Sequence, residues 1–208
     1  MILKQSISFP FFMMNFMMMN PIINHLIILY MFLSVTWCGI IVPRDHCTWL
    51  NGHYGNELKC DGDQVVVGAC GGGRNPDCGG YNTQLLCCSL PMFYYSNCEK
   101  FGVHHGELGS CLDHGDLPLM LEGSCGSGEK EDCDGFSVVN DCCEGHMATG
   151  ESVGPQTDQC GWIYTAHGYP LECGRSDEIV AGRCGSGENE DCPRDSSHGI
   201  LCCELVSL

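Results

Sequence analysis

Two glycine-rich loops carry carboxylates at positions that could bind a calcium ion. They read GSGEKEDC at 126–133 and GSGENEDC at 185–192 of the 208-residue chain. Calcium takes six to eight oxygen ligands, which carboxylates alternating with backbone carbonyls can supply. The candidate calcium ligands are Glu129, Glu131, Asp132, Glu188, Glu190 and Asp191.

A third loop, GGGRNPDC at 71–78, has the same glycines, aspartate and cysteine but lacks the glutamates. The spacing also differs from that of an EF-hand loop. A calcium site that the fold required would not be missing from one of three equivalent loops. The pattern therefore favours a turn in which the aspartate before the cysteine (Asp77, Asp132 or Asp191) hydrogen-bonds its own backbone.

A second group of residues has the chemistry of a saccharide site. The segments TWLNGHYGNELK, EKFGVHHGELGS and GWIYTAHGYPLE each place a histidine near a glycine, and two of them have tryptophan at the second position. An indole can stack on a sugar ring while a histidine hydrogen-bonds its hydroxyls. The candidate ligand-binding residues are Trp49, His53, Tyr54, His104, His105, Trp162 and His167. The alternative, which we favour, is that these side chains shield disulfides in a module short of apolar residues.

Three sets of six cysteines must position both groups. In each set the first and second cysteines are 13 residues apart, the third and fourth are 8 apart, and the last two are adjacent. The sets are Cys47, Cys60, Cys70, Cys78, Cys87 and Cys88; Cys98, Cys111, Cys125, Cys133, Cys142 and Cys143; and Cys160, Cys173, Cys184, Cys192, Cys202 and Cys203. Such internal repetition predicts three tandem modules of one kind.

The modules are predicted to be small, disulfide-rich and mostly β or irregular. Apolar runs at 64–68, 117–121 and 178–182 each precede a Gly-x-Cys, and further apolar runs end each module. Six cysteines allow 15 pairings, which the spacing leaves open. Adjacent cysteines rarely bond each other, so we expect each terminal pair to reach two partners, on opposite faces if it lies on a strand. Modules of about 50 residues rely on such bridges for stability.

The predicted domains are an apolar leader at 1–38, module 1 at 44–91, module 2 at 92–143, a flexible linker at 144–159 and module 3 at 160–208. The linker is polar and rich in glycine, serine and threonine. The connector at 89–97 is short and aromatic, so we expect it to pack modules 1 and 2 together.

The leader, with the apolar run LIILYMFLSV at 26–35, predicts a secretory signal peptide; an uncleaved membrane anchor at 26–42 is the alternative. Cleavage after Cys38 would leave an even number of cysteines. Nineteen cysteines indicate an oxidising compartment, so the protein is expected to be secreted and extracellular.

Charge and motifs restrict the function. A chain with 9 Lys and Arg against 26 Asp and Glu is unsuited to nucleic acid, and a cleaved leader leaves no membrane partner. No motif predicts an enzyme or a cofactor, and zinc is disfavoured because its usual cysteine ligands should be in disulfides. We therefore expect a non-enzymatic extracellular binding protein, with a glycan or a matrix or cell-surface protein as partner. Acidic modules 2 and 3 suit a basic partner. The alternative is a secreted protease inhibitor with a host-defence role, its reactive loop flanked by Arg175 and Arg183.

Overall fold

The computed structural model describes most of the compact unit Cys38–Leu208. The described residues are 39–53, 55–71, 77–104, 106–114, 117–126, 133–166, 168–185, 192–193 and 196–208, and the expected leader lies outside them. Within these ranges, no helix has the length and apolar character needed to cross a membrane.

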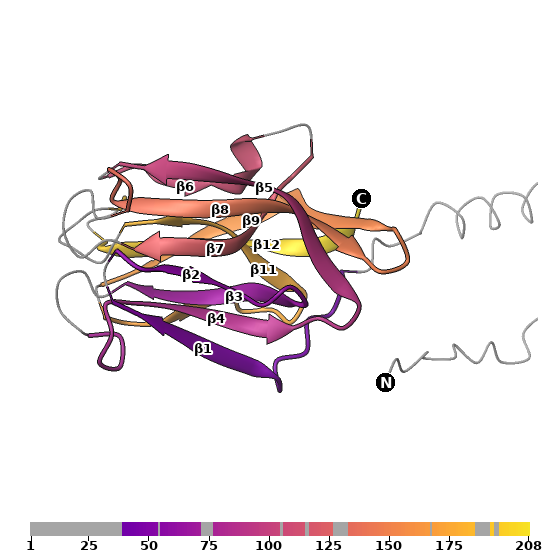
Figure 1. Ribbon diagram of the computed structural model, residues 1–208, viewed down its shortest axis with the longest axis horizontal. Coiled ribbons are helices and arrows are strands. Elements are labelled where there is room, and N and C mark those ends of the chain that lie inside the picture. Colours follow the sequence, from indigo (N-terminus) through magenta and orange to yellow (C-terminus); the bar gives the residue numbers. More distant parts are fainter. Residues whose placement is uncertain are drawn as a thin grey trace, which may run out of the picture. The chain divides into compact units, whose positions relative to one another are not determined.

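The described part of the chain is mostly β-strand, as expected, with one short 3-10 helix (Figure 1). The first set of strands is β1 (Cys47–Gly52), β2 (Glu57–Lys59), β3 (Gln64–Gly71) and β4 (Thr83–Ser89). The second is β5 (Phe93–Val103), β6 (Leu108–Ser110), the 3-10 helix η2 (Cys111–Asp113), β7 (Met120–Gly126) and β8 (Val138–Met147). The third is β9 (Ser152–Thr165), β10 (Leu171–Glu172), β11 (Glu178–Cys184) and β12 (His198–Ser207).

In each set, three strands form an antiparallel sheet, and the three sheets have the same strand order. The last strand lies in the middle, between the first and the third, in the orders β1-β4-β3, β5-β8-β7 and β9-β12-β11. The third strand carries a bulge in each sheet, at Val66/Gly68, Leu121/Gly123 and Val180/Gly182. The recurring Gly-x-Cys therefore marks the residue after a bulge rather than the end of a strand.

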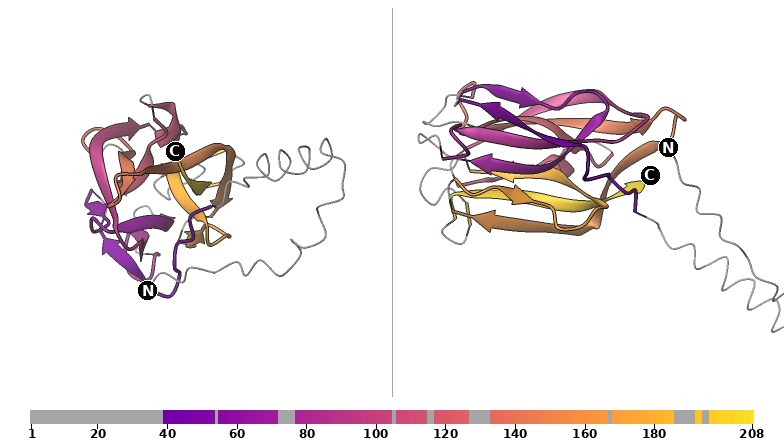
Figure 2. Two further views of the ribbon diagram at one scale, coloured as in Figure 1. Left: turned by 90° about the vertical axis from the view of Figure 1, so that its right-hand side faces the viewer. Right: turned by 90° about the horizontal axis from the view of Figure 1, so that it is seen from below.

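The short second strand of each set pairs with the sheet of another set. Strand β2 pairs with β7, β6 pairs with β11, and β10 pairs with β3. Each three-stranded sheet thus gains a fourth strand, and the exchange runs in a closed cycle. The left panel of Figure 2, which looks along the strands, shows the three sets surrounding a common centre, where β3, β7 and β11 contact one another.

The glycine after each bulge allows the exchanged strand to approach. A Cβ atom on Gly68, Gly123 or Gly182 would lie 2.5, 2.7 or 2.4 Å from a backbone carbonyl oxygen of that strand. Any side chain at these positions would push the fourth strand away from the sheet.

The disulfides have one connectivity in all three sets: first to sixth, second to fifth and third to fourth cysteine. The nine bonds among the described residues are Cys47–Cys88, Cys60–Cys87, Cys70–Cys78, Cys98–Cys143, Cys111–Cys142, Cys125–Cys133, Cys160–Cys203, Cys173–Cys202 and Cys184–Cys192. The adjacent pair Cys87 and Cys88 lies on β4 and reaches two partners, as expected. Its members contribute to separate hydrophobic clusters because neighbouring strand residues point to opposite faces.

Both clusters draw residues from all three sets. One includes Val65, Met120 and Ile179, and the other includes Val66, Leu121 and Val180. Neighbouring residues of one bulged strand therefore enter different clusters. Because the apolar contacts are shared between sets, their hydrophobic energy stabilises the three sets together rather than three separate units.

The segment 144–159 is not a flexible linker. Its first residues belong to β8 and its last to β9, which leaves a turn of only four residues, 148–151. Gly145 pairs with Val153, and this contact joins the second and third sheets. The prediction of a linker was wrong because it relied on polar side chains. Strand pairing uses backbone hydrogen bonds, which polar residues form as well as apolar ones.

The aromatic connector packs as expected, except for Tyr94. Phe93 is buried in the shared core and Tyr95 packs edge-on against it, with ring centroids 4.7 Å apart. Tyr94 points outward, is 45% exposed and stacks on His146.

Candidate functional site

On each of the three sheets, one residue from each of the four strands lies in a row that crosses the strands. It begins two residues after a first cysteine, on the edge strand, and ends with the residue before a second cysteine, on the exchanged strand. Read across the four strands, the rows are Trp49, Leu86, Gly68 and Glu172; Lys100, Asp141, Gly123 and Lys59; and Trp162, Leu201, Gly182 and Ser110. We name them the Trp49 row, the Lys100 row and the Trp162 row. Residues paired across strands share a face of the sheet.

A groove of about 470 Å³ lies over the Trp49 row. The half-buried indole of Trp49 stands at one side and the exposed Glu172 at the other. Further lining comes from Arg44, Leu86, Arg175 and Ser176. The groove exists because β10, from the third set, lies beside β3 of the first.

Arg44 fixes one wall of this groove. Its Nη2 donates to the carbonyl oxygens of Arg175 at 2.7 Å and Glu178 at 2.8 Å, and so holds the loop that follows β10. Burial lowers the pKa of the Arg44 guanidinium, although Glu172 and Glu178 oppose the shift. The half-buried Arg44 guanidinium therefore binds backbone carbonyls of the groove wall and is not available to bind a ligand.

Arg175 is held more loosely at the exposed rim. Its Nη2 pairs with Asp177 at 2.7 Å and Glu204 at 3.1 Å. The bond to Asp177 raises the pKa of Arg175. With Glu172, Asp177 and Glu204 close by, these charges do not make the groove a site for anions.

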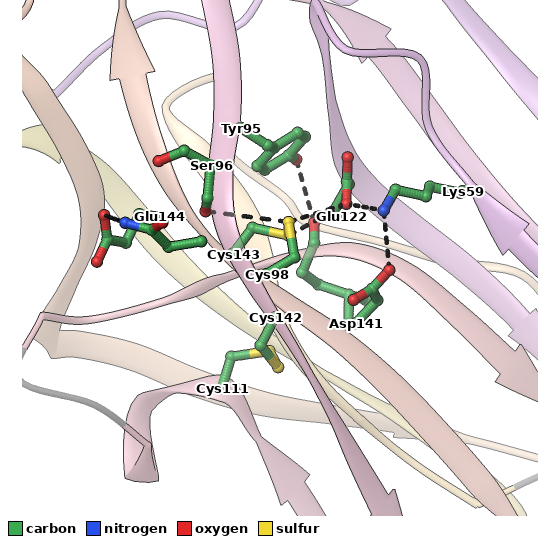
Figure 3. Close-up of a disulfide and its surroundings, with 12 residues drawn as sticks. Lys59, Tyr95, Ser96, Cys98, Cys111, Glu122, Asp141, Cys142, Cys143 and Glu144 are labelled. Atoms are coloured by element: carbon green, nitrogen blue, oxygen red, sulfur yellow. Dashed lines mark hydrogen bonds and ion pairs between the residues drawn. A yellow bond between two sulfur atoms is a disulfide. The ribbon is translucent and has the colours of Figure 1, made fainter.

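The Lys100 row is filled by ion pairs instead (Figure 3). Lys59 Nζ lies 2.5 Å from Glu122 and 3.0 Å from Asp141, both of which are buried. Burial raises the pKa of Glu122, with Lys59 acting against the shift. Burial lowers the pKa of Lys59, but its bonds to the two carboxylates outweigh this and raise it overall. Lys100 at the edge pairs with Glu57 at 2.6 Å.

Glu122 also touches the disulfide Cys98–Cys143. Its Oε2 lies 3.3 Å and 3.1 Å from the two sulfur atoms (Figure 3). These three residues have the spacing of metal ligands, but the sulfurs are bonded to each other and are not thiolates. Nearby, Tyr95 donates to the carbonyl of Leu121 at 3.2 Å, and burial followed by the charge of Glu122 raises its pKa. The cluster is a structural bridge between sets one and two.

The predicted saccharide residues are only partly brought together. Trp49 and Trp162 take equivalent places on their sheets. His53 and His104 lie beyond the strand ends, exposed, beside Tyr81 and Phe136 respectively, and neither lines the Trp49 groove. Tyr54, His105 and His167 lie outside the described residues. The candidate calcium ligands Glu129, Glu131, Asp132, Glu188, Glu190 and Asp191 also lie outside them.

The inhibitor loop proposed between Arg175 and Arg183 is not formed. Arg183 is completely buried on β11, whereas Arg175 is exposed. The apolar run between them is a core strand and cannot enter a protease cleft.

Sequence reasoning missed Arg44 and Glu172 as groove residues. Glu172 had one signal, its place directly before a second cysteine, which Lys59 shares. That signal has no meaning until the strand exchange is known, and strands of two or three residues show no periodicity.

Comparisons of this chain with known protein families, with curated proteins and with solved structures found no match.

Proposed function

We propose that this protein is a secreted, non-enzymatic binding protein and that the Trp49 groove binds a neutral saccharide. The observation that carries the proposal is the placement of Trp49 and Glu172 on opposite sides of one groove of about 470 Å³. This volume is within the range typical of small-molecule sites.

The chemistry of the groove suits a sugar ring. The apolar C–H face of a pyranose can pack on the indole, while its hydroxyls bond polar groups at the other side. Glu172 accepts hydrogen bonds and Arg175 donates them. Beside Trp49 on β1, the amides of Asn51 and Gln84 bond each other at 2.5 Å and extend the polar surface. The acidic surroundings favour a neutral ligand over an anionic one.

Secretion is supported by the nine disulfides, which are typical of extracellular proteins. We propose that the leader is removed and that Cys38 leaves with it. Sequencing the N-terminus of protein recovered from the culture medium tests this: a chain that retains residues 1–38 and sediments with membranes would contradict it.

Binding is tested by screening the secreted protein on a glycan array and measuring the best neutral ligand by calorimetry. Trp49→Ala should weaken binding at least tenfold, because the indole supplies the stacking surface. Glu172→Ala should weaken it less, by loss of one or two hydrogen bonds. Lys100→Ala, at the equivalent place in another row, is the control and should bind as the wild type does. Equal affinity of Trp49→Ala and wild type, or retention of no glycan at all, would overturn the proposal.

A further inference from the structure

We propose that Trp162 and Tyr164 form a second saccharide site, an aromatic platform, and that the ligand is therefore a neutral polysaccharide of repeating units. This inference rests on the proposed function, and it adds the class of ligand.

The two rings lie together on one face of the sheet. Trp162 and Tyr164 alternate along β9 and so point to the same face of the sheet. Their ring planes are within 10° of parallel, with centroids 6.0 Å apart. Both side chains are half-buried, which leaves part of each ring in contact with solvent.

A glycine holds the tyrosine ring against the sheet. Tyr164 pairs with Gly199 on β12, and a Cβ atom at Gly199 would lie 2.6 Å from Cδ1 of the ring. The ring therefore lies over the bare backbone of the neighbouring strand.

On the third sheet, the platform lies at the position that is equivalent to the Trp49 groove on the first sheet. Trp162 opposes Leu201 as Trp49 opposes Leu86. The row ends in Ser110 where the Trp49 row ends in Glu172, so the four residues of this row carry no charge. An uncharged aromatic surface suits the C–H faces of successive neutral sugars better than it suits an ionic ligand.

The Lys100 row cannot form a saccharide site. Lys100 replaces the tryptophan, and Lys59, Glu122 and Asp141 are joined in ion pairs across the sheet. Two of the three rows therefore remain for sugars. Two sites on one rigid body raise the apparent affinity for a polymer above that for a short fragment, by making the second contact intramolecular.

Single-tryptophan proteins report on each site separately. The secreted protein without residues 1–38 has two tryptophans, so Trp162→Phe leaves Trp49 as the reporter and Trp49→Phe leaves Trp162. The probes are cellohexaose, chitohexaose and laminarihexaose, together with the corresponding insoluble polymers. We expect the same hexasaccharide to change the fluorescence of both proteins. Tyr164→Ala should change the response of Trp162 and leave that of Trp49 intact.

Retention on the polymer provides the second measurement. Trp162→Ala with Tyr164→Ala should reduce retention at least tenfold while the Trp49 reporter still titrates with the hexasaccharide. If Trp49 responds but Trp162 does not, and the double variant is retained like wild type, the platform is not a site and the proposed function stands. If neither tryptophan responds to any saccharide, the proposed function fails as well. Unchanged far-ultraviolet circular dichroism of each variant excludes misfolding as the cause.

Discussion

The guanidinium of Arg183 on β11 donates from Nη2 to the carbonyl oxygen of Cys70 on β3, at 2.9 Å, with no part of the arginine exposed. Nη1 lies 3.5 Å from the hydroxyl of Ser124 on β7, so one side chain joins the third strands of all three sets. Among the described residues, no group forms a hydrogen bond with its Nε and no carboxylate forms an ion pair with the guanidinium. Burial lowers the pKa of Arg183 to about 10.

Arg183→Ala should therefore lower the free energy of unfolding by about 3–5 kcal/mol, through the cavity and the lost hydrogen bond to the Cys70 carbonyl. Lys100→Ala, which removes an exposed ion pair, should cost less than about 1 kcal/mol. Urea denaturation of both variants checks this. Equal losses would mean that Arg183 does not hold the centre together.

The bulge glycines should be intolerant of alanine. Gly182→Ala places a Cβ 2.4 Å from the carbonyl oxygen of Gly109, and we expect a loss of more than about 2 kcal/mol. Gly161→Ala is the matched control on β9, where a Cβ meets nothing within 4 Å. It should be neutral or slightly stabilising. Thermal denaturation of the two proteins decides, and similar melting temperatures would argue against the close approach of β6.

The disulfides should differ in their contribution to stability. Cys47–Cys88 closes a separation of 41 residues and Cys70–Cys78 one of 8. Loop-closure entropy gives about 4 kcal/mol for the first and about 2.5 kcal/mol for the second. Two double variants test this order: in each, one cysteine of the pair is replaced with alanine and the other with serine. Urea denaturation measures the free energy of unfolding that each variant loses. The reverse order would show that contacts in the native state outweigh loop entropy.

Stability should fall in acid because of His198. Burial, assisted by the charge of Arg183, lowers the pKa of this imidazole to about 3 from its ordinary 6.5, and its Nε2 lies 3.2 Å from the carbonyl of Ala69. Between these values only the unfolded chain binds the proton, so the free energy of unfolding decreases as the pH falls from 6.5 to 3.

At about pH 4.5 the loss from His198 is about 2–3 kcal/mol relative to neutral pH. His198→Gln removes this component, so its unfolding energy should depend on pH less steeply by that amount. Urea titrations at several pH values compare the two proteins. Glu122 acts in the opposite direction, since its pKa is raised, but it is present in both. Parallel pH profiles would contradict the assignment.

Hydrogen exchange should distinguish strand from linker in 144–159. The amide of Met147 donates to Glu151 at 2.8 Å, and the amide of Leu208 donates to Ser152 at 2.9 Å. We expect the amides of 144–147 and 152–154 to exchange slowly, at rates close to those of β12, and those of Thr149 and Glu151 in the turn to exchange fast. Full exchange of 152–154 at the earliest time point would show that this segment is a flexible linker after all.

Local features were predictable from the sequence where side chains determine them. The runs at 64–68 and 178–182 lie within β3 and β11, and each adjacent pair of cysteines reaches two different partners. The run at 117–121 overlaps β7 only at its end.

Features that depend on backbone pairing between distant segments were not predictable. The first part of β9, 152–159, is polar and was predicted to belong to the linker, and β2, β6 and β10 are too short to show a pattern. The sequence predicted Trp49 as a ligand-binding residue. Glu172, on the opposite side of the groove, comes from a segment more than a hundred residues away in the sequence. Only the exchange of strands places the two beside one groove.

The cyclic exchange of β2, β6 and β10 also fixes how many copies of the unit one chain can hold. A linear array of repeats can grow or shrink by whole units, because each unit touches only the one before and the one after. Here the last set returns its strand to the first, and removing one set would leave one sheet without a fourth strand and one strand without a sheet. Duplication or loss of a single unit during evolution would break the ring, so variation must occur within the rows, by exchanges such as tryptophan for lysine.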